Sequence, residues 1–152
     1  MNKSVTIIDY GMGNLWSVVN AFHYLGCDPI VTNDPNEISR AEVLILPGVG
    51  SFRKAMKSLV SKGIDEAIID AVQNKGGKIL GICLGMQLLG VESSEDGKSS
   101  GLGLIPQSVD RFSPQELGIN KLPHIGFNLV HSTPDSKLFH GLPDKADFYF
   151  VH

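Results

Sequence analysis

The chain has 152 residues, which is enough to bury the core of one domain. Its formal charge of −3 and its 19% charged residues give no indication of a nucleic acid or an anionic membrane as a partner. The first apolar run is too short for a signal peptide or a membrane span, and two cysteines are too few for a disulfide framework. We therefore expect a cytoplasmic protein with reduced thiols and without a metal or cofactor.

The first part of the chain predicts alternating strands and helices. Predicted strands, recognised by short apolar or β-branched runs, are Val5–Ile8, Pro29–Thr32, Val43–Leu46 and Lys78–Ile82. Predicted helices, recognised by helical spacing of apolar residues, are Leu15–Leu25, Phe52–Val60, Ile64–Asn74 and Leu84–Leu89. Because the strands read as buried on both faces, this order predicts an α/β fold with a mostly parallel sheet and helices on both faces.

Three loops directly follow predicted strands: Asp9–Asn14, Pro47–Ser51 and Gly81–Gly85. In an open parallel sheet, ligands bind outside the carboxyl ends of the strands. We therefore expect these loops to meet and to form the site.

The remainder of the chain has a different character. After the polar stretch "ESSEDGKSSG" come β-like pieces at Leu102–Phe112, His124–His131 and Phe148–Val151, separated by proline turns. We interpret them as an antiparallel extension of a single domain that spans residues 1–152.

One of the two cysteines lies in "GICLG", where a predicted strand becomes a helix. The pattern Gly-x-nucleophile-x-Gly is typical of a tight turn in which Gly81 and Gly85 leave room for the backbone. A helix beginning at Leu84 favours the thiolate of Cys83, and the Leu84 N–H is placed for an oxyanion. The alternative is that Cys83 is only a small buried core residue, and the pattern alone does not choose between them.

The loop "LPGVGSF" also bears on this cysteine. Gly48, Val49 and Gly50 lie at the end of a neighbouring predicted strand and can offer a second N–H to the same centre. Together the two glycine-rich strand ends favour acyl transfer with a two-donor oxyanion hole. The alternative is an ordinary short turn between strand and helix.

These segments, with "IIDYGMGNL" and "LPHIGFN", resemble the class I (triad) glutamine amidotransferases. Within that family they are most similar to the glutaminase subunits of imidazole glycerol phosphate synthase, which serve histidine biosynthesis. The resemblance runs along essentially the whole chain. It implies a flavodoxin-like fold, L-glutamine as substrate, no cofactor, and a synthase (cyclase) partner with a (β/α)-barrel that receives ammonia.

The resemblance also implies roles for individual residues. Cys83 is the expected nucleophile that forms a thioester with glutamine. The expected oxyanion donors are Leu84, Gly48, Val49 and Gly50, the last three after a backbone flip. Gln87 and Glu95 are expected to hold glutamine, with Glu95 binding its α-ammonium group. Residues expected to face the synthase and its ammonia tunnel are Asn14, Trp16, His124, Phe127 and Asn128.

The catalytic base is the main departure from the family pattern. The triad needs a histidine and an orienting acid, which the family takes from a late His-Pro-Glu motif. The sequence ends at "FYFVH", and His152 matches an earlier interface segment instead. We therefore expect the carboxyl-terminal part of the domain, with the triad histidine and glutamate, to be missing, and the 152-residue chain to be inactive.

Two alternatives to the histidine pathway remain open. Trp16 stands where a basic residue is expected in the histidine-pathway subunit, and Phe127 stands where tryptophan is expected. A related glutaminase that supplies a sugar-amidating enzyme of surface polysaccharide synthesis therefore remains an alternative. A second alternative is a flavodoxin-like assembly module without catalysis, although such a module would have no need of Cys83.

Overall fold

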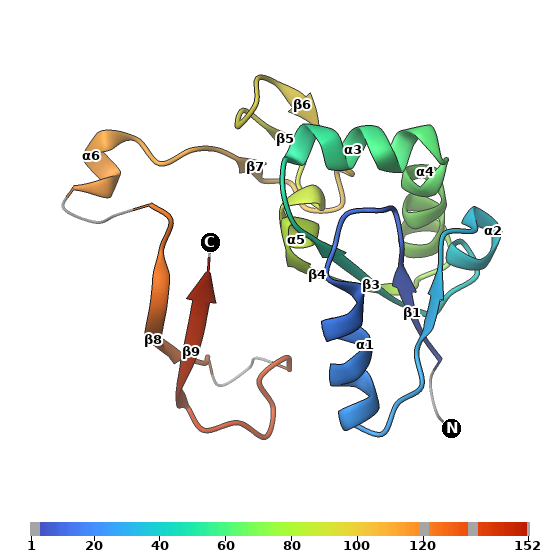
Figure 1. Ribbon diagram of the computed structural model, residues 1–152, viewed down its shortest axis with the longest axis horizontal. Helices are drawn as coiled ribbons and strands as arrows, with labels where there is room; N and C mark the ends of the chain where they lie inside the picture. The colour runs from blue at the N-terminus through green and yellow to red at the C-terminus, as the bar shows by residue number, and fades with distance from the viewer. Residues whose placement is uncertain (1–3, 119–121, 134–136, 152) are drawn as a thin grey trace. The chain divides into compact units, whose positions relative to one another are not determined.

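The computed structural model describes residues 4–118, 122–133 and 137–151 (Figure 1). The chain divides into two compact units, Met1–Arg111 and Phe112–His152. The first unit contains a four-stranded parallel sheet and a small three-stranded sheet, and the second contains a two-stranded antiparallel sheet. The single domain over residues 1–152 stays a prediction.

The main sheet has the predicted strands in the order β2-β1-β3-β4, and all neighbouring strands pair in parallel. The bounds of these strands are β1 Val5–Ile8, β2 Ile30–Thr32, β3 Val43–Gly48 and β4 Lys78–Cys83. Parallel pairing requires crossover connections, and helices occupy the connections from β1 to β2 and from β3 to β4. The predicted α/β class with a mostly parallel sheet is confirmed.

Helices cover both faces of the sheet, as predicted (Figure 1). Alternate residues of β1 and β3 point to opposite faces. Val5, Ile7 and Ile45 pack against α1, whereas the opposite face, which includes Leu44 and Leu46, forms the larger core with the remaining helices. The helices of this unit are α1 Leu15–Tyr24, α2 Pro35–Ile38, α3 Phe52–Ser61, α4 Ile64–Ile69, the π-helical η1 Asp70–Asn74 and α5 Leu84–Leu88.

Strand β3 runs farther than the sequence predicts. The sequence predicts that the strand ends at Leu46, because Pro47 lacks the N–H that a central strand donates. In the structure Pro47 and Gly48 continue the pairing with β4, opposite Ile82 and Cys83. The pairing of β3 with β1 ends at Ile45, so Pro47 lies beyond the part that is paired on both sides. This extension brings Gly48 directly opposite Cys83.

Burial of β4 differs from the sequence prediction. Its side chains Leu80 and Ile82 are 42% and 37% exposed, so the expectation of burial on both faces is wrong for this strand. The reason is its place at the edge of the described sheet. Leu80 pairs with Ile45 and lies on the same face of the sheet. On that face α1 packs against residues of β1 and β3.

The segment Leu102–Phe112 forms less β-structure than predicted. Only Ser108–Val109 is a strand, β7, which joins β5 (Glu92–Ser93) and β6 (Ser99–Ser100) in the small sheet. The backbone N–H groups of Leu102 and Leu104 instead donate to Leu88 and Leu89 at the end of α5. Leu102 is buried in the main core, so packing against α5 takes the place of strand pairing.

The second unit contains a regular hairpin. Strands β8 (Ile125–His131) and β9 (Lys145–Val151) pair antiparallel over their full lengths, in agreement with the predicted antiparallel pieces. A short helix, α6 (Pro114–Leu117), precedes them. Ser113 and Glu116 form a capping box at its start, a signal that our sequence prediction of this segment missed.

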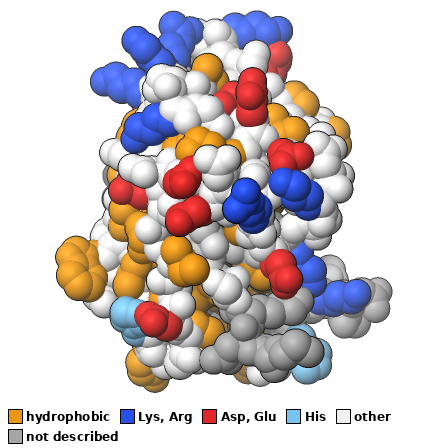
Figure 2. Space-filling view, turned by 90° about the vertical axis from the view of Figure 1, so that its right-hand side faces the viewer, with side chains coloured by type: hydrophobic (Ala, Val, Ile, Leu, Met, Phe, Trp, Pro, Cys, Tyr) orange, Lys and Arg blue, Asp and Glu red, His pale blue; other side chains and the backbone are white. Residues whose placement is uncertain are grey.

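Two general properties of the described residues bear on function. None of their helices is both long enough and apolar enough to cross a membrane. On the face shown in Figure 2, several basic side chains gather at the upper end, and basic and acidic side chains are intermixed below them. The formal charge of the whole chain is −3.

Two glycines allow α5 to lie directly on the sheet. A β-carbon on Gly85 would overlap the carbonyl oxygen of Leu46 in β3. A β-carbon on Gly81 would lie 2.5 Å from the backbone nitrogen of Met86 in α5. Backbone atoms cannot move aside as a flexible side chain can, so both positions require glycine.

We expect Gly85→Ala to lower the free energy of unfolding by about 3 kcal/mol or more, because its methyl group has no space. The control is Gly76→Ala, since Gly76 has a φ of +72° but no atom within 4 Å of the added carbon, whereas Gly85 lies in α5 without a positive φ. We expect the control to cost about 1 kcal/mol from backbone strain alone. Urea titration of both variants measures the difference, and equal losses would contradict the close packing.

Candidate active site

The three loops at the carboxyl ends of the strands meet, as the sequence predicts. A β-carbon on Gly13 would lie 3.4 Å from the Pro47 side chain, and one on Gly50 would lie 3.3 Å from Met12. The loop after β1 therefore contacts the loop after β3. Gly48 in turn lies against α5, because a β-carbon there would be 2.8 Å from the Gly85 nitrogen. All three strand ends thus contribute to one region.

Cys83 occupies the turn between β4 and α5 in a strained backbone conformation. Its φ of 55° and ψ of −117° make it the one non-glycine residue with a positive φ among those described. Such a conformation costs about 1–3 kcal/mol and is maintained only by the surrounding structure. The residue is also exposed, so the alternative of a small buried core residue is wrong.

The predicted oxyanion residues lie beside Cys83. Leu84 is the first residue of α5, and its buried side chain anchors the turn in the core. Gly48 is the register partner of Cys83 across the β3–β4 pair. Val49 is 54% exposed and Gly50 has a φ of +101°, so the backbone turns sharply just after the strand. Two segments of main chain therefore lie next to Cys83.

The two predicted glutamine-binding residues lie on different elements. Gln87 is half-buried on α5, four residues after Cys83, which places it one helical turn along. Glu95 is exposed in the turn between β5 and β6. Its backbone N–H donates to Ser93 Oγ at 3.2 Å, and its carboxylate forms no ion pair with another described residue.

The turn that carries Glu95 is held from both sides. Ser94 Oγ donates to Asp110 at 2.7 Å, and Ser108 Oγ donates to the other oxygen of the same carboxylate at 2.8 Å. These hydroxyls lower the pKa of Asp110. On the other side, Ser51 Oγ donates to Asp96. Since Ser51 caps α3 just after Gly50, the Glu95 turn is tied to the oxyanion loop.

The residues predicted to face a synthase belong to both units. In the first unit, Asn14 caps α1 by accepting a hydrogen bond from the Ser17 N–H at 3.2 Å, and Trp16 is 74% exposed. The predicted residues of the second unit are His124, Phe127 and Asn128. That all five form one face stays a prediction.

Aromatic pairs order this part of the second unit. Phe127 is 71% exposed and meets Tyr149 edge-on, with ring centroids 5.0 Å apart. The ring of His124 lies 5.6 Å from that of Phe150. Since β8 and β9 pair in register at Phe127 and Tyr149, these contacts come directly from the hairpin. His152 lies outside the described residues.

Tyr10 lies against Gly48 in this region, although the motif "IIDYGMGNL" predicts no role for it. Its side chain is 1% exposed, and its hydroxyl has no hydrogen-bond partner among the described residues. Burial raises the pKa of Tyr10 well above its usual value, and the nearby charge of Cys83 adds to this effect.

We also searched the described residues for side chains that could bind a metal ion. Within residues 4–118, 122–133 and 137–151, no group of three or more histidine, cysteine, aspartate or glutamate side chains is arranged to hold a metal ion.

The backbone at Cys83 leads to a stability prediction. We expect the free energy of unfolding of Cys83→Gly to be about 1 kcal/mol higher than that of Cys83→Ala, because glycine relieves the backbone strain that alanine retains. At Cys27, where φ is not positive, we expect the opposite order for the same pair of substitutions. Urea unfolding of the four variants measures both differences. Greater stability of the alanine variant at residue 83 would contradict the strained turn.

Comparison with known proteins identifies the family. The family model for class-I glutamine amidotransferases matches residues 6–152. Imidazole glycerol phosphate synthase subunit HisH of Moorella thermoacetica is 49% identical over 150 residues, which cover 99% of this chain and 69% of that protein. HisH of Chlorobaculum tepidum is 47% identical over 148 residues, covering 97% and 72%. HisH 1 of Parasynechococcus marenigrum is 44% identical over 150 residues, covering 99% and 71%.

Solved structures show the same fold at low sequence identity. A crystallised glutamine amidotransferase has a TM-score of 0.73 at 18% identity, and the match covers 97% of this chain and 71% of that one. A second, from Thermotoga maritima, has a TM-score of 0.55 at 18% identity, covering 100% and 61%. With the match to the family model and the three sequence relatives, the conclusion is that the chain belongs to the class-I glutamine amidotransferase family.

Proposed function

We propose that this chain is the glutaminase subunit of imidazole glycerol phosphate synthase and supplies ammonia for histidine biosynthesis. Relatives that carry this name are 44%, 47% and 49% identical to it. The observation that carries the catalytic part of the proposal is the exposed Cys83 in a strained turn, with Gly48 directly opposite. An energetically costly conformation of a reactive side chain is typical of a functional site.

The proposed reaction is amide hydrolysis through a thioester. The Cys83 thiolate attacks the carboxamide carbon of L-glutamine, and the oxygen takes up the negative charge. N–H groups of Leu84 and of the Gly48–Gly50 segment stabilise this oxyanion. When the intermediate collapses, the C–N bond breaks, and the nitrogen takes up the proton that left the thiol and departs as ammonia. Water then hydrolyses the thioester, which gives glutamate and frees the Cys83 thiol.

Substrate binding and proton transfer complete the proposal. Gln87 and Glu95 hold glutamine, with the Glu95 carboxylate pairing with the α-ammonium group. The family resemblance assigns the base that takes the thiol proton, and the acid that orients this base, to a His-Pro-Glu motif; residues 1–152 contain no such motif.

Ammonia has to reach a second enzyme without escaping to solvent. We propose that a synthase (cyclase) subunit with a (β/α)-barrel covers the site and receives it. Trp16 and Phe127 are large exposed aromatic side chains of the kind that anchor protein interfaces. The exposed Trp16 also favours a second candidate partner, a sugar-amidating enzyme, because the histidine-pathway subunit is expected to have a basic residue there.

Covalent labelling tests the nucleophile. A diazoketone analogue of glutamine should label wild-type full-length protein at Cys83, and Cys83→Ala should lose labelling and at least about a thousandfold of glutaminase activity. The matched control is Cys27→Ala, which removes the half-buried second thiol and should keep both properties. Mass spectrometry of the labelled peptide locates the adduct. Labelling of Cys83→Ala with retained activity would overturn the assignment.

Addition of candidate partners tests the pathway. We expect low glutaminase activity from the full-length protein alone, because the Gly48–Gly50 segment must first present its N–H to the oxyanion. Activity should rise at least about tenfold with the imidazole glycerol phosphate synthase cyclase subunit of the same organism, and not with a sugar-amidating synthetase. High activity without any partner, or stimulation by the synthetase alone, would contradict this prediction.

A further inference from the structure

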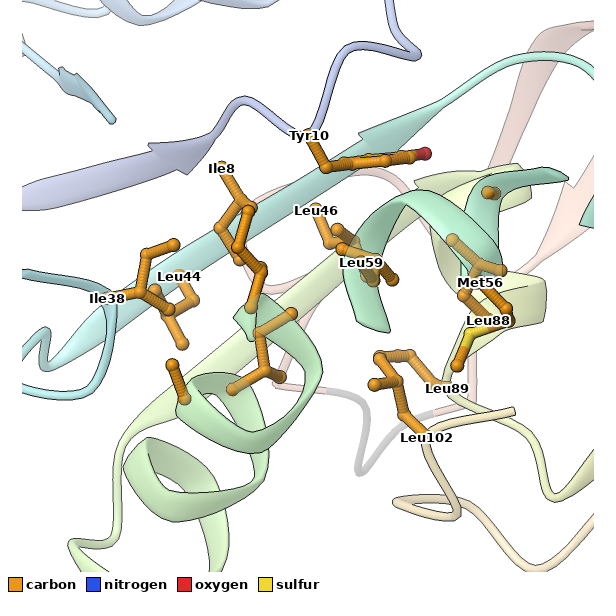
Figure 3. Packing of buried hydrophobic residues seen from close by; sticks show 14 of the residues in the cluster. Ile8, Tyr10, Ile38, Leu44, Leu46, Met56, Leu59, Leu88, Leu89 and Leu102 are labelled. Carbon is orange, nitrogen blue, oxygen red and sulfur yellow. The ribbon is translucent and has the colours of Figure 1, made fainter. Parts of the chain in front are cut away.

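Tyr10 is held firmly although its hydroxyl is unpaired. The residue follows β1, and its carbonyl oxygen accepts hydrogen bonds from Ser58 Oγ and, at 3.0 Å, from Lys62 Nζ. Its ring belongs to the main core (Figure 3). The main chain and the ring are therefore fixed by contacts that do not involve the hydroxyl.

The unpaired hydroxyl is an anomaly for a buried group. Figure 3 shows the ring at an edge of the cluster, with the oxygen pointing away from Ile8. The oxygen is inaccessible to solvent and has no partner among the described residues. Buried polar groups in native proteins are nearly always hydrogen-bonded, because leaving water without a replacement partner is costly. A phenylalanine would fill the same space without this cost. We therefore infer that the hydroxyl has a hydrogen-bond partner in another conformation of the site.

The position of the hydroxyl indicates where that partner lies. A β-carbon on Gly48 would be only 2.6 Å from the Tyr10 oxygen. The hydroxyl therefore lies against the main chain of the segment that is expected to form the oxyanion hole. Gly48 is also opposite Cys83, and the charge of Cys83 acts on the Tyr10 hydroxyl, so the hydroxyl lies near the same stretch of main chain as Cys83.

The segment after Gly48 is built to change its backbone conformation. Val49 is 54% exposed and lies between two glycines, so few side-chain contacts oppose rotation of the peptide planes. Rotation of a peptide plane by about half a turn exchanges the directions of its N–H and its C=O. When the N–H turns toward an oxyanion at Cys83, the carbonyl turns away and needs a donor on the inner side.

We propose that the Tyr10 hydroxyl donates a hydrogen bond to a peptide carbonyl of the Pro47–Val49 segment when glutamine is bound, and thereby holds the oxyanion N–H toward Cys83. The inference rests on the proposed glutaminase function and makes Tyr10 a positioning residue, because it touches neither substrate nor thiol. Like any tyrosine hydroxyl, it carries its proton at neutral pH and can donate. The close contact between Gly48 and the Tyr10 oxygen also leaves no space for a β-carbon at residue 48.

The test compares Tyr10→Phe with wild type in the full-length protein bound to its synthase subunit. We expect kcat for glutamine hydrolysis to fall about three- to tenfold, the value of one hydrogen bond made on the way to the transition state. KM for glutamine should change less than about twofold. The melting temperature of the free subunit should stay unchanged or rise by a few degrees, because the variant removes an unpaired buried hydroxyl.

The matched control is Tyr24→Phe, since Tyr24 is 91% exposed on α1 and the same atom is removed. It should leave kcat, KM and melting temperature unchanged. The rate of Cys83 alkylation by iodoacetamide should be equal in all three proteins, because alkylation does not use an oxyanion hole. This rate separates loss of positioning from damage to the nucleophile.

Each outcome decides the matter. Wild-type kcat in Tyr10→Phe would overturn the inference while the proposed function stands. A lower melting temperature together with lower kcat would also overturn it, because Tyr10 would then be a structural residue. If wild type hydrolyses no glutamine even with its synthase, or if Cys83→Ala remains active, the proposed function fails and the inference fails with it.

A crystal structure with a glutamine-derived thioester should show the Tyr10 oxygen within hydrogen-bonding distance of a carbonyl oxygen of residues 47–49.

Discussion

The close approach of α5 to the end of β3 is the constraint on which the site depends. Gly85 lies so near the Leu46 carbonyl that no side chain fits between helix and strand. This contact forces the chain to turn sharply after β4, and Cys83 takes the strain as a positive φ. The same contact places Gly48 beside the first residues of the helix. The exposed thiol and the neighbouring main chain are thus consequences of one packing arrangement.

The main hydrophobic core of the first unit provides the stability that keeps α5 and the end of β3 in this arrangement. The main core joins β1 and β3 to α2, α3, α4 and α5 through buried aliphatic side chains (Figure 3). Hydrophobic burial on this scale exceeds the roughly 1–3 kcal/mol that a strained residue such as Cys83 costs. An unpaired hydroxyl at Tyr10 is a second local cost carried by the same core. Both costs lie within the region formed by the three strand ends, and local costs of this kind are typical of functional sites.

Hydrogen bonds from outside the sheet extend the site beyond the cysteine. The turn that carries Glu95 has no large core of its own, and its position comes from Ser94 with Asp110 and from Ser51 with Asp96. Because Ser51 also caps α3 directly after the Gly48–Gly50 segment, its hydrogen bond to Asp96 joins that segment to the turn that carries Glu95. The hairpin of the second unit is ordered differently, by backbone pairing and by aromatic pairs such as Phe127 with Tyr149.

The sequence by itself determined the features that local chemistry controls. Apolar runs located β1 and β3, helical spacing located α1 and α3, and the two glycines around Cys83 predicted its tight turn. Tertiary structure alone decided the exposure of Leu80 at a sheet edge and the bonding of Leu102 to the end of α5. It also decided that the Tyr10 hydroxyl lies unpaired behind Gly48. Such features depend on which residues distant in sequence come into contact, and a local pattern contains no information about those neighbours.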